Sequence, residues 1–113
     1  MVTNKEYLTG ALVLAHSLKA TKTTRKILCM VTSNLSDQDW HLLRAGGLEP
    51  VLVESIAAPS PSGIDQWDDV GYTKLNLWRL VDWDLLVYFD ADCLVLESVD
   101  DLFLRFPPAS RLT

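Results

Sequence analysis

The 113-residue sequence has few cysteines, no cluster of basic residues and no long apolar run. Cys29 and Cys93 lie in apolar runs rather than in a C-x-x-C spacing, which argues against a zinc site and predicts two buried free thiols. A net charge of -5 argues against a nucleic-acid surface or an anionic membrane as partner. No stretch approaches the ~18 apolar residues of a membrane span, and the N-terminus lacks a signal-peptide pattern. We therefore expect a cytoplasmic protein, or a Golgi protein if an anchor precedes this chain.

The composition is that of a globular protein, with 49% hydrophobic and 22% charged residues. The length suits one domain over residues 1–113, since single cores commonly use about 100 to 150 residues. Helical periods alternate with short apolar runs, which predicts an α/β fold with a mainly parallel sheet and helices on both faces. Three helices are expected: residues 5–19, the segment from Ser36 to Gly46-Gly47, and the segment through Leu75, Trp78 and Val81 to Asp82. Three strands are expected: Ile27–Val31, Val51–Val53 and Leu85–Phe89.

Local signals mark where these elements begin. Asn4 can cap the first helix, and Ser36 with Asp39 matches a capping box. Residues 55–69 are rich in Pro, Ser and Gly and are a candidate lid or binding loop. Residues 1–3 are too short for the usual opening strand, and a polar tail follows Phe106, so we expect a domain truncated at both ends.

The strongest chemical signal is Asp90-Ala91-Asp92, at the end of the apolar run Leu85–Phe89. Two carboxylates beside one small residue can turn toward one point beyond the carboxyl edge of a parallel sheet, where ligands usually bind. Mg2+ and Mn2+ prefer such oxygen ligands together with water and phosphate. A strand-end turn with solvated aspartates is the alternative, because D-x-D occurs often by chance.

Four segments in order around this tripeptide resemble glycosyltransferase family 8, the retaining transferases of GT-A fold that include glycogenin and galactinol synthases. They are the turn and helix from Thr3-Asn4 through Tyr7 to Gly10–Leu14, then Tyr72–Leu75 with Trp78, then Tyr88–Asp92, and finally Val99–Phe103. The resemblance implies an incomplete GT-A domain with a Rossmann-like sheet. It also implies a retaining hexosyltransferase that uses a UDP-sugar, with UDP-glucose preferred, and a carbohydrate or protein acceptor.

By this resemblance, Thr3, Asn4 and Tyr7 would contact the uracil and ribose, and Lys74 would reach the sugar diphosphate. Asp90 and Asp92 would hold Mn2+ or Mg2+, and Val70 and Ala91 would complete the donor site. From the residues alone, Asn4 is equally a helix cap, Tyr7 a partly buried helix residue and Lys74 a solvated charge.

The sequence also departs from the family pattern. Residues 65–69 are acidic where glycogenin has a basic residue that assists the diphosphate, which leaves the donor sugar open. The family's His-x-x-Gly-x-x-Lys stretch and acceptor segment would lie beyond Thr113, and His16 and His41 sit on expected helices, so they cannot replace its histidine. We therefore expect this chain to be inactive alone and its full-length parent, which could be a homodimer, to be the enzyme.

Two other functions fit parts of the sequence. Asp90 could be the nucleophile of a haloacid-dehalogenase-like phosphatase, although Leu94 stands where that motif has Thr or Val. The chain could instead be a non-catalytic fragment that binds a nucleotide sugar weakly. In that case Trp67, Trp78 and Trp83 would cover surface that a missing half normally buries.

Overall fold

The computed structural model describes residues 1–57 and 69–105, in which two parallel strands form the sheet. Strand β1 (Leu28–Val31) pairs along its length with β2 (Glu49–Leu52). On the opposite edge of β1, Val2 forms a single parallel bridge with Val31, and the Val2 amide donates to the Met30 carbonyl at 2.8 Å. The predicted parallel α/β architecture is confirmed, and β1 is the interior strand. The segment before the first helix contributes one bridge in place of a strand.

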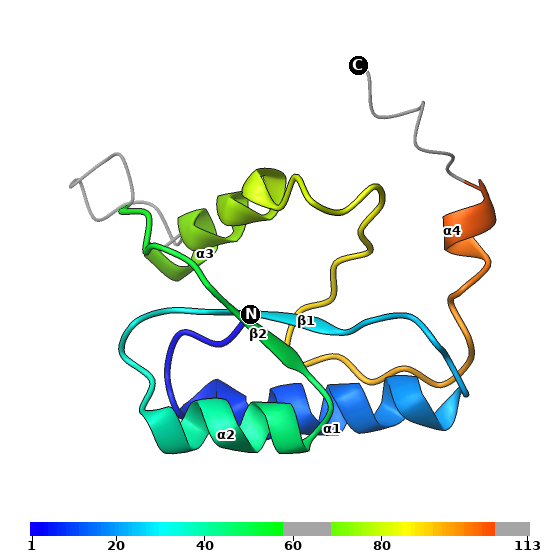
Figure 1. Cartoon of the computed structure of the whole chain (residues 1–113), viewed down its shortest axis with the longest axis horizontal. Coiled ribbons are helices and arrows are strands. Elements are labelled where there is room, and N and C mark those ends of the chain that lie inside the picture. The colour runs from blue at the N-terminus through cyan, green and yellow to red at the C-terminus, as the bar shows by residue number, and fades with distance from the viewer. Residues whose placement is uncertain (58–68, 106–113) are drawn as a thin grey trace.

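Helices α1 (Glu6–Ala20) and α2 (Asp37–Ala45) lie together on one side of the strands (Figure 1). Asn4 caps α1 as predicted, because its side-chain oxygen accepts from the Glu6 amide at 2.9 Å. The Ser36 and Asp39 capping box is also confirmed, with each side chain bonded to the other residue's backbone amide. These caps fix where the two helices start and therefore which side chains they bury.

The hydrophobic core lies between these helices and the strands. Leu43 and Val31 have no exposed surface, and Ala15 is equally buried at the centre of α1. The complete buried cluster is Val2, Leu8, Ala11, Ala15, Cys29, Val31, Leu35, Leu43 and Leu48. Five apolar residues recur at three- and four-residue spacing along this helix, namely Leu8, Ala11, Leu12, Ala15 and Leu18. All of them are buried except the partly buried Leu12, whereas the buried Leu14 and Ser17 lie outside this period.

The third predicted helix ends earlier and is more exposed than its sequence suggests. It consists of α3 (Asp69–Thr73) and a 3-10 segment, η1 (Lys74–Arg79), and it ends before Asp82. Trp78 and Val81 are 76% and 81% exposed, so the predicted apolar period does not mark a buried face. The segment is instead attached through polar groups: Asn76 Nδ2 donates to the Glu54 carbonyl at 2.7 Å, and the Ile56 amide donates to Thr73 Oγ1 at 3.0 Å.

The predicted strand Leu85–Phe89 is not formed. The residues from 85 to 89 are half-buried, and their backbone pairs with no described strand. They line an apolar cavity of about 630 Å³ together with β1 residues such as Met30. On one edge β1 is paired along its length with β2, and on the other edge it makes only the single bridge to Val2. Among the described residues, no neighbouring strand is therefore present on that side for residues 85–89 to pair with.

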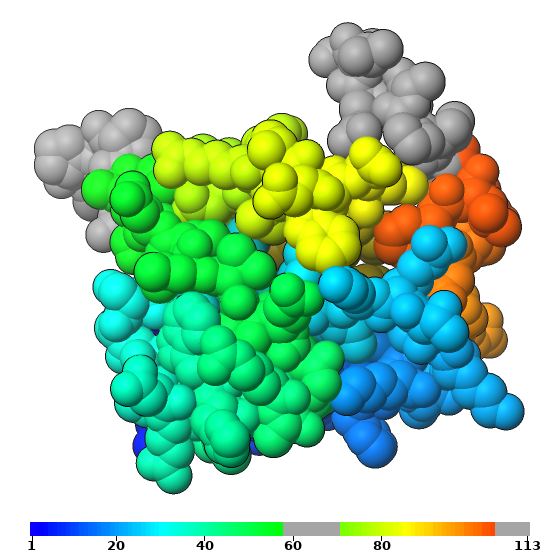
Figure 2. Space-filling model, viewed as in Figure 1, coloured from blue at the N-terminus to red at the C-terminus, as the bar shows by residue number. Residues whose placement is uncertain are grey.

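The rest of the chain after η1 is mostly irregular. Figure 2 shows the yellow residues that follow α3 resting on the part of the chain formed by the first two helices and strands. Beyond the Asp90 turn, the Val95 amide donates to Ser17 Oγ of α1 at 3.0 Å, and the short helix α4 (Leu102–Arg105) closes the described part. Cys29 is buried as predicted, whereas Cys93 is exposed, because no sheet forms to cover the residues around it.

Some sequence predictions concern residues outside the described ranges. The candidate lid falls mostly on 58–68, Trp67 lies there too, and the polar tail falls on 106–113. None of the described helices has the length and apolar character needed to cross a membrane.

Candidate functional site

A cavity of about 190 Å³ gathers residues from three separate parts of the sequence. One part is the first turn of α1 with the residues before it, the second is the start of η1, and the third is the segment 88–92. The lining residues are Met1, Thr3, Tyr7, Lys74, Tyr88, Asp90, Ala91 and Asp92. Six of the eight residues predicted for the donor site therefore line one cavity.

The two remaining predicted residues differ from these six. Asn4 does not line the cavity, because its side-chain oxygen is used to cap α1 through the Glu6 and Tyr7 amides. Its contribution to the site is to fix the turn that carries Thr3 and Tyr7. Val70 lies in α3, one turn before Lys74, and its side chain is outside what the structure describes.

A glycine brings α1 against the acidic turn. An added Cβ at Gly10 would stand 2.7 Å from the carbonyl oxygen of Ala91, a distance that real Cβ atoms essentially never show. The turn itself is closed by the Cys93 amide, which donates to the Asp90 carbonyl at 3.1 Å. Gly10 thus allows the backbone between the two aspartates to lie directly on the helix, and Ala91 is only 9% exposed there.

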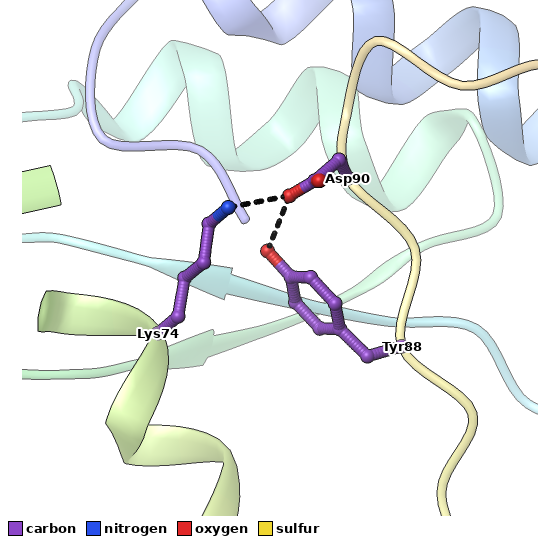
Figure 3. A network of polar contacts seen from close by, with 3 residues as sticks. All are labelled: Lys74, Tyr88 and Asp90. Carbon is purple, nitrogen blue, oxygen red and sulfur yellow. Dashed lines mark hydrogen bonds and ion pairs between the residues drawn. The ribbon is translucent and has the colours of Figure 1, made fainter. Parts of the chain in front are cut away.

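Lys74, Tyr88 and Asp90, which all line the cavity, form a polar network (Figure 3). Lys74 Nζ donates to Asp90 Oδ1 at 2.7 Å, and the Tyr88 hydroxyl donates to the same oxygen at 3.3 Å. The ammonium group also lies 5.9 Å from the centre of the Tyr88 ring. Asp90 is thereby held by two donors from different segments, and both Asp90 and Asp92 are exposed to solvent.

The ionisation states of this network follow from its contacts. The hydrogen bond from Lys74 lowers the pKa of Asp90 below its ordinary value, against a smaller opposite effect of burial, so Asp90 is a carboxylate at neutral pH. Burial, and next the negative charge of Asp90, raise the pKa of Tyr88 well above that of a free tyrosine. Tyr88 therefore keeps its proton and acts as the donor to Asp90.

Two features of the cavity indicate that it is suited to a polar ligand. Thr3 Oγ1 is buried and has no hydrogen-bond partner among the described residues, which is a costly arrangement unless a ligand or water supplies one. Tyr7 is 42% exposed at the same cavity and offers part of its ring for stacking.

The acidic side chains could hold a cation, but the described residues do not form a closed metal site. No three His, Cys, Asp or Glu side chains gather anywhere in the described ranges. Asp90 and Asp92 supply oxygen ligands of the type that Mg2+ and Mn2+ accept, and such ions commonly complete their shell with water and phosphate. His16 and His41 are exposed on α1 and α2, as predicted, and do not line the cavity.

Sequence reasoning missed the hydroxyl of Tyr88, although a signal for it was present. Alternate residues of an extended segment point to the same side, so the residue two before Asp90 should share its side. Met1 was also missed as a lining residue, and no motif pointed to it.

No family model matches the chain. Individual proteins do match it over most of its length. The chain is 36% identical to glycogenin-1 of Caenorhabditis elegans over 109 residues, covering 93% of the chain and 25% of that protein. It is 35% identical to human glycogenin-1, covering 93% of the chain and 31% of the relative. It is 32% identical over 97 residues to UDP-glucuronate:xylan alpha-glucuronosyltransferase 1 of Arabidopsis thaliana, covering 86% of the chain and 15% of the relative. The chain thus spans a third or less of these proteins.

Proposed function

Since the chain is homologous to glycosyltransferases of family 8, we propose that it forms the donor-binding part of a UDP-sugar-dependent retaining hexosyltransferase that uses Mn2+ or Mg2+. The observation that carries this proposal is the cavity, in which Thr3, Tyr7, Lys74 and both aspartates converge from distant parts of the sequence. The relatives support the reaction class, and the cavity supports the assignment of residues to roles.

Each group at the cavity has a role suited to its chemistry. Thr3 Oγ1 would satisfy its missing hydrogen bond on the uracil or ribose, and the Tyr7 ring would stack on the base. Asp90 and Asp92 would hold the metal ion, which when bound neutralises the negative charge of a departing UDP. Lys74 would add a second positive charge at the diphosphate.

The size of the cavity limits what this chain can hold by itself. Ligand pockets are commonly about 300 to 1,000 Å³, and this one is about 190 Å³. It suits part of a nucleotide sugar rather than the whole molecule. We therefore propose that further residues of a longer parent protein surround the sugar and the acceptor, and that the isolated chain binds the donor without transferring it.

The identity of the donor sugar is a separate and more specific proposal. We favour UDP-glucose on the likeness to glycogenin, and UDP-glucuronate is the competing candidate because it appears in the names of several relatives. The two can be compared by the thermal stabilisation that each gives to the longer parent protein, whose further residues would surround the sugar. A larger Tm shift with UDP-glucuronate would reverse the preference.

The proposed function is tested by thermal denaturation with UDP and Mn2+. At about a hundredfold excess over its Kd, a ligand stabilises a protein by about 2.7 kcal/mol, a Tm shift on the order of 10 °C for a domain of this size. We expect UDP to raise the Tm only when Mn2+ is present, and Asp92→Asn to remove the shift. Asp82→Asn is the matched control, since Asp82 is exposed and outside the cavity. Equal shifts in the wild type and Asp92→Asn would refute the proposal, and hydrolysis of a simple phosphomonoester would favour the phosphatase alternative.

A further inference from the structure

Lys74 forms an ion pair with Asp90, one of the two carboxylates proposed to hold the metal ion. Its ammonium nitrogen is 2.7 Å from Asp90 Oδ1, and the Tyr88 hydroxyl contacts the same oxygen (Figure 3). The ion pair joins the start of η1 to the acidic turn, sixteen residues later in the sequence. Without nucleotide, the charge of Asp90 is therefore already balanced by a group of the protein itself.

A divalent cation that binds Asp90 must share this carboxylate with the ammonium group or displace it. Two cations at contact distance from one carboxylate repel each other. The Asp90 side chain is 50% exposed, so water and salt reduce this repulsion but do not remove it at so short a separation. Lys74 has a flexible four-carbon chain and its side chain is 36% exposed, so it can move away. After displacement the ammonium group of Lys74 still lies close to the divalent cation. The repulsion between the two positive charges is unfavourable unless an anion lies between them.

The diphosphate of a nucleotide is an anion that could accept both cations. We propose that Lys74 is an internal counter-cation of Asp90, which weakens the binding of metal alone and, by moving to the diphosphate, couples metal binding to nucleotide binding. This inference rests on the proposed function, because it needs a donor diphosphate at the cavity. It goes beyond that function by giving Lys74 a role in the empty site as well as in the occupied one.

The coupling has a thermodynamic consequence that can be measured. If the nucleotide raises the affinity for the metal, the metal raises the affinity for the nucleotide by the same factor. Removing the ammonium group should strengthen the binding of metal alone, because Asp90 loses its competitor. It should also weaken the coupling, because the nucleotide no longer relieves any repulsion.

The test is the titration of Mn2+ followed by the electron paramagnetic resonance signal of the free ion, with and without UDP. Lys74→Met removes the charge and keeps most of the side-chain length, and Lys74→Gln serves as a second neutral variant. We expect both to bind Mn2+ alone at least about fivefold more tightly than the wild type and to show a smaller enhancement by UDP, since coupling factors are commonly 5 to 150-fold. Lys74→Arg keeps the charge and should resemble the wild type.

Lys26→Met is the matched control, because Lys26 also faces a carboxylate, that of Glu49 at 3.9 Å, but does not line this cavity. It should leave Mn2+ binding unchanged. Neutral Lys74 variants that are folded by circular dichroism and bind Mn2+ no more tightly than the wild type would overturn the counter-cation role. If UDP and Mn2+ fail to enhance each other in the wild type, the proposed function falls and this inference falls with it. Unchanged Mn2+ binding in folded neutral Lys74 variants overturns only the counter-cation role, so the two failures are distinguishable.

Discussion

Replacing Gly10 by alanine should weaken the fold, although the same change in most helices strengthens it. In an open helix interior, alanine is favoured over glycine by about 1 kcal/mol. Here the new Cβ would stand 2.7 Å from the Ala91 carbonyl oxygen and would have to open this distance to at least 3.0 Å. The obstacle is backbone, which cannot turn aside as a side chain does, and overpacking of this kind costs about 1 to 3 kcal/mol. The net expectation is a loss of about 1 kcal/mol in the free energy of unfolding.

Urea denaturation followed by tryptophan fluorescence measures this change. Thr9→Ala is the matched control, since Thr9 is exposed on the same helix and gains only helix propensity, a few tenths of a kcal/mol. Gly10→Ala should also reduce the Tm shift given by UDP and Mn2+, because the displaced backbone joins Asp90 to Asp92. A Gly10→Ala variant that is more stable than the wild type by the usual helix gain would refute the close contact between α1 and the acidic turn.

Three further predictions follow from burial and capping. Leu43→Ala should lower the free energy of unfolding by about 2.7 to 5 kcal/mol, because Leu43 is fully buried. Leu42 is 42% exposed, so Leu42→Ala should lower it by less than about 1 kcal/mol. Similar losses in the two variants would place Leu43 outside the core. A thiol reagent should modify exposed Cys93 rapidly and Cys29 only on unfolding, because burial raises the pKa of the Cys29 thiol; equal rates would contradict this. Ser36→Ala should cost about 1 kcal/mol in urea denaturation, and no loss would show that the capping box contributes nothing.

Local signals in the sequence were sufficient for the first half of the fold. The Asn4 cap, the capping box at Ser36 and the period of α1 each depend on residues within one or two turns, and each was predicted correctly. Even the interior position of β1 could be predicted, because an unbroken apolar run indicates burial on both faces.

The site was predictable for a different reason. The two aspartates were predicted from their own chemistry at a strand end, and Tyr7 and Lys74 were predicted from the resemblance to a family. The structure places Tyr7, Lys74 and Asp90 at one cavity. What resemblance could not supply is the pairing inside the cavity. The ion pair of Lys74 with Asp90 depends on how η1 approaches the acidic turn, and no spacing in the sequence specifies that approach.

The unformed strand at residues 85–89 shows where sequence patterns reach their limit. A run of apolar side chains is compatible with a buried strand, but a strand forms only where a neighbouring backbone segment can pair with it through hydrogen bonds. β2 pairs with one edge of β1 and Val2 makes a single bridge on the other, and no described strand beyond Val2 offers hydrogen bonds to residues 85–89. The acidic turn is nevertheless in place without the strand, because Gly10 and Ser17 of α1 hold it directly, through the contact with Ala91 and the bond from Val95. The geometry of this cavity therefore depends on the first helix more than on the sheet, which is why a single methyl group at Gly10 should disturb it.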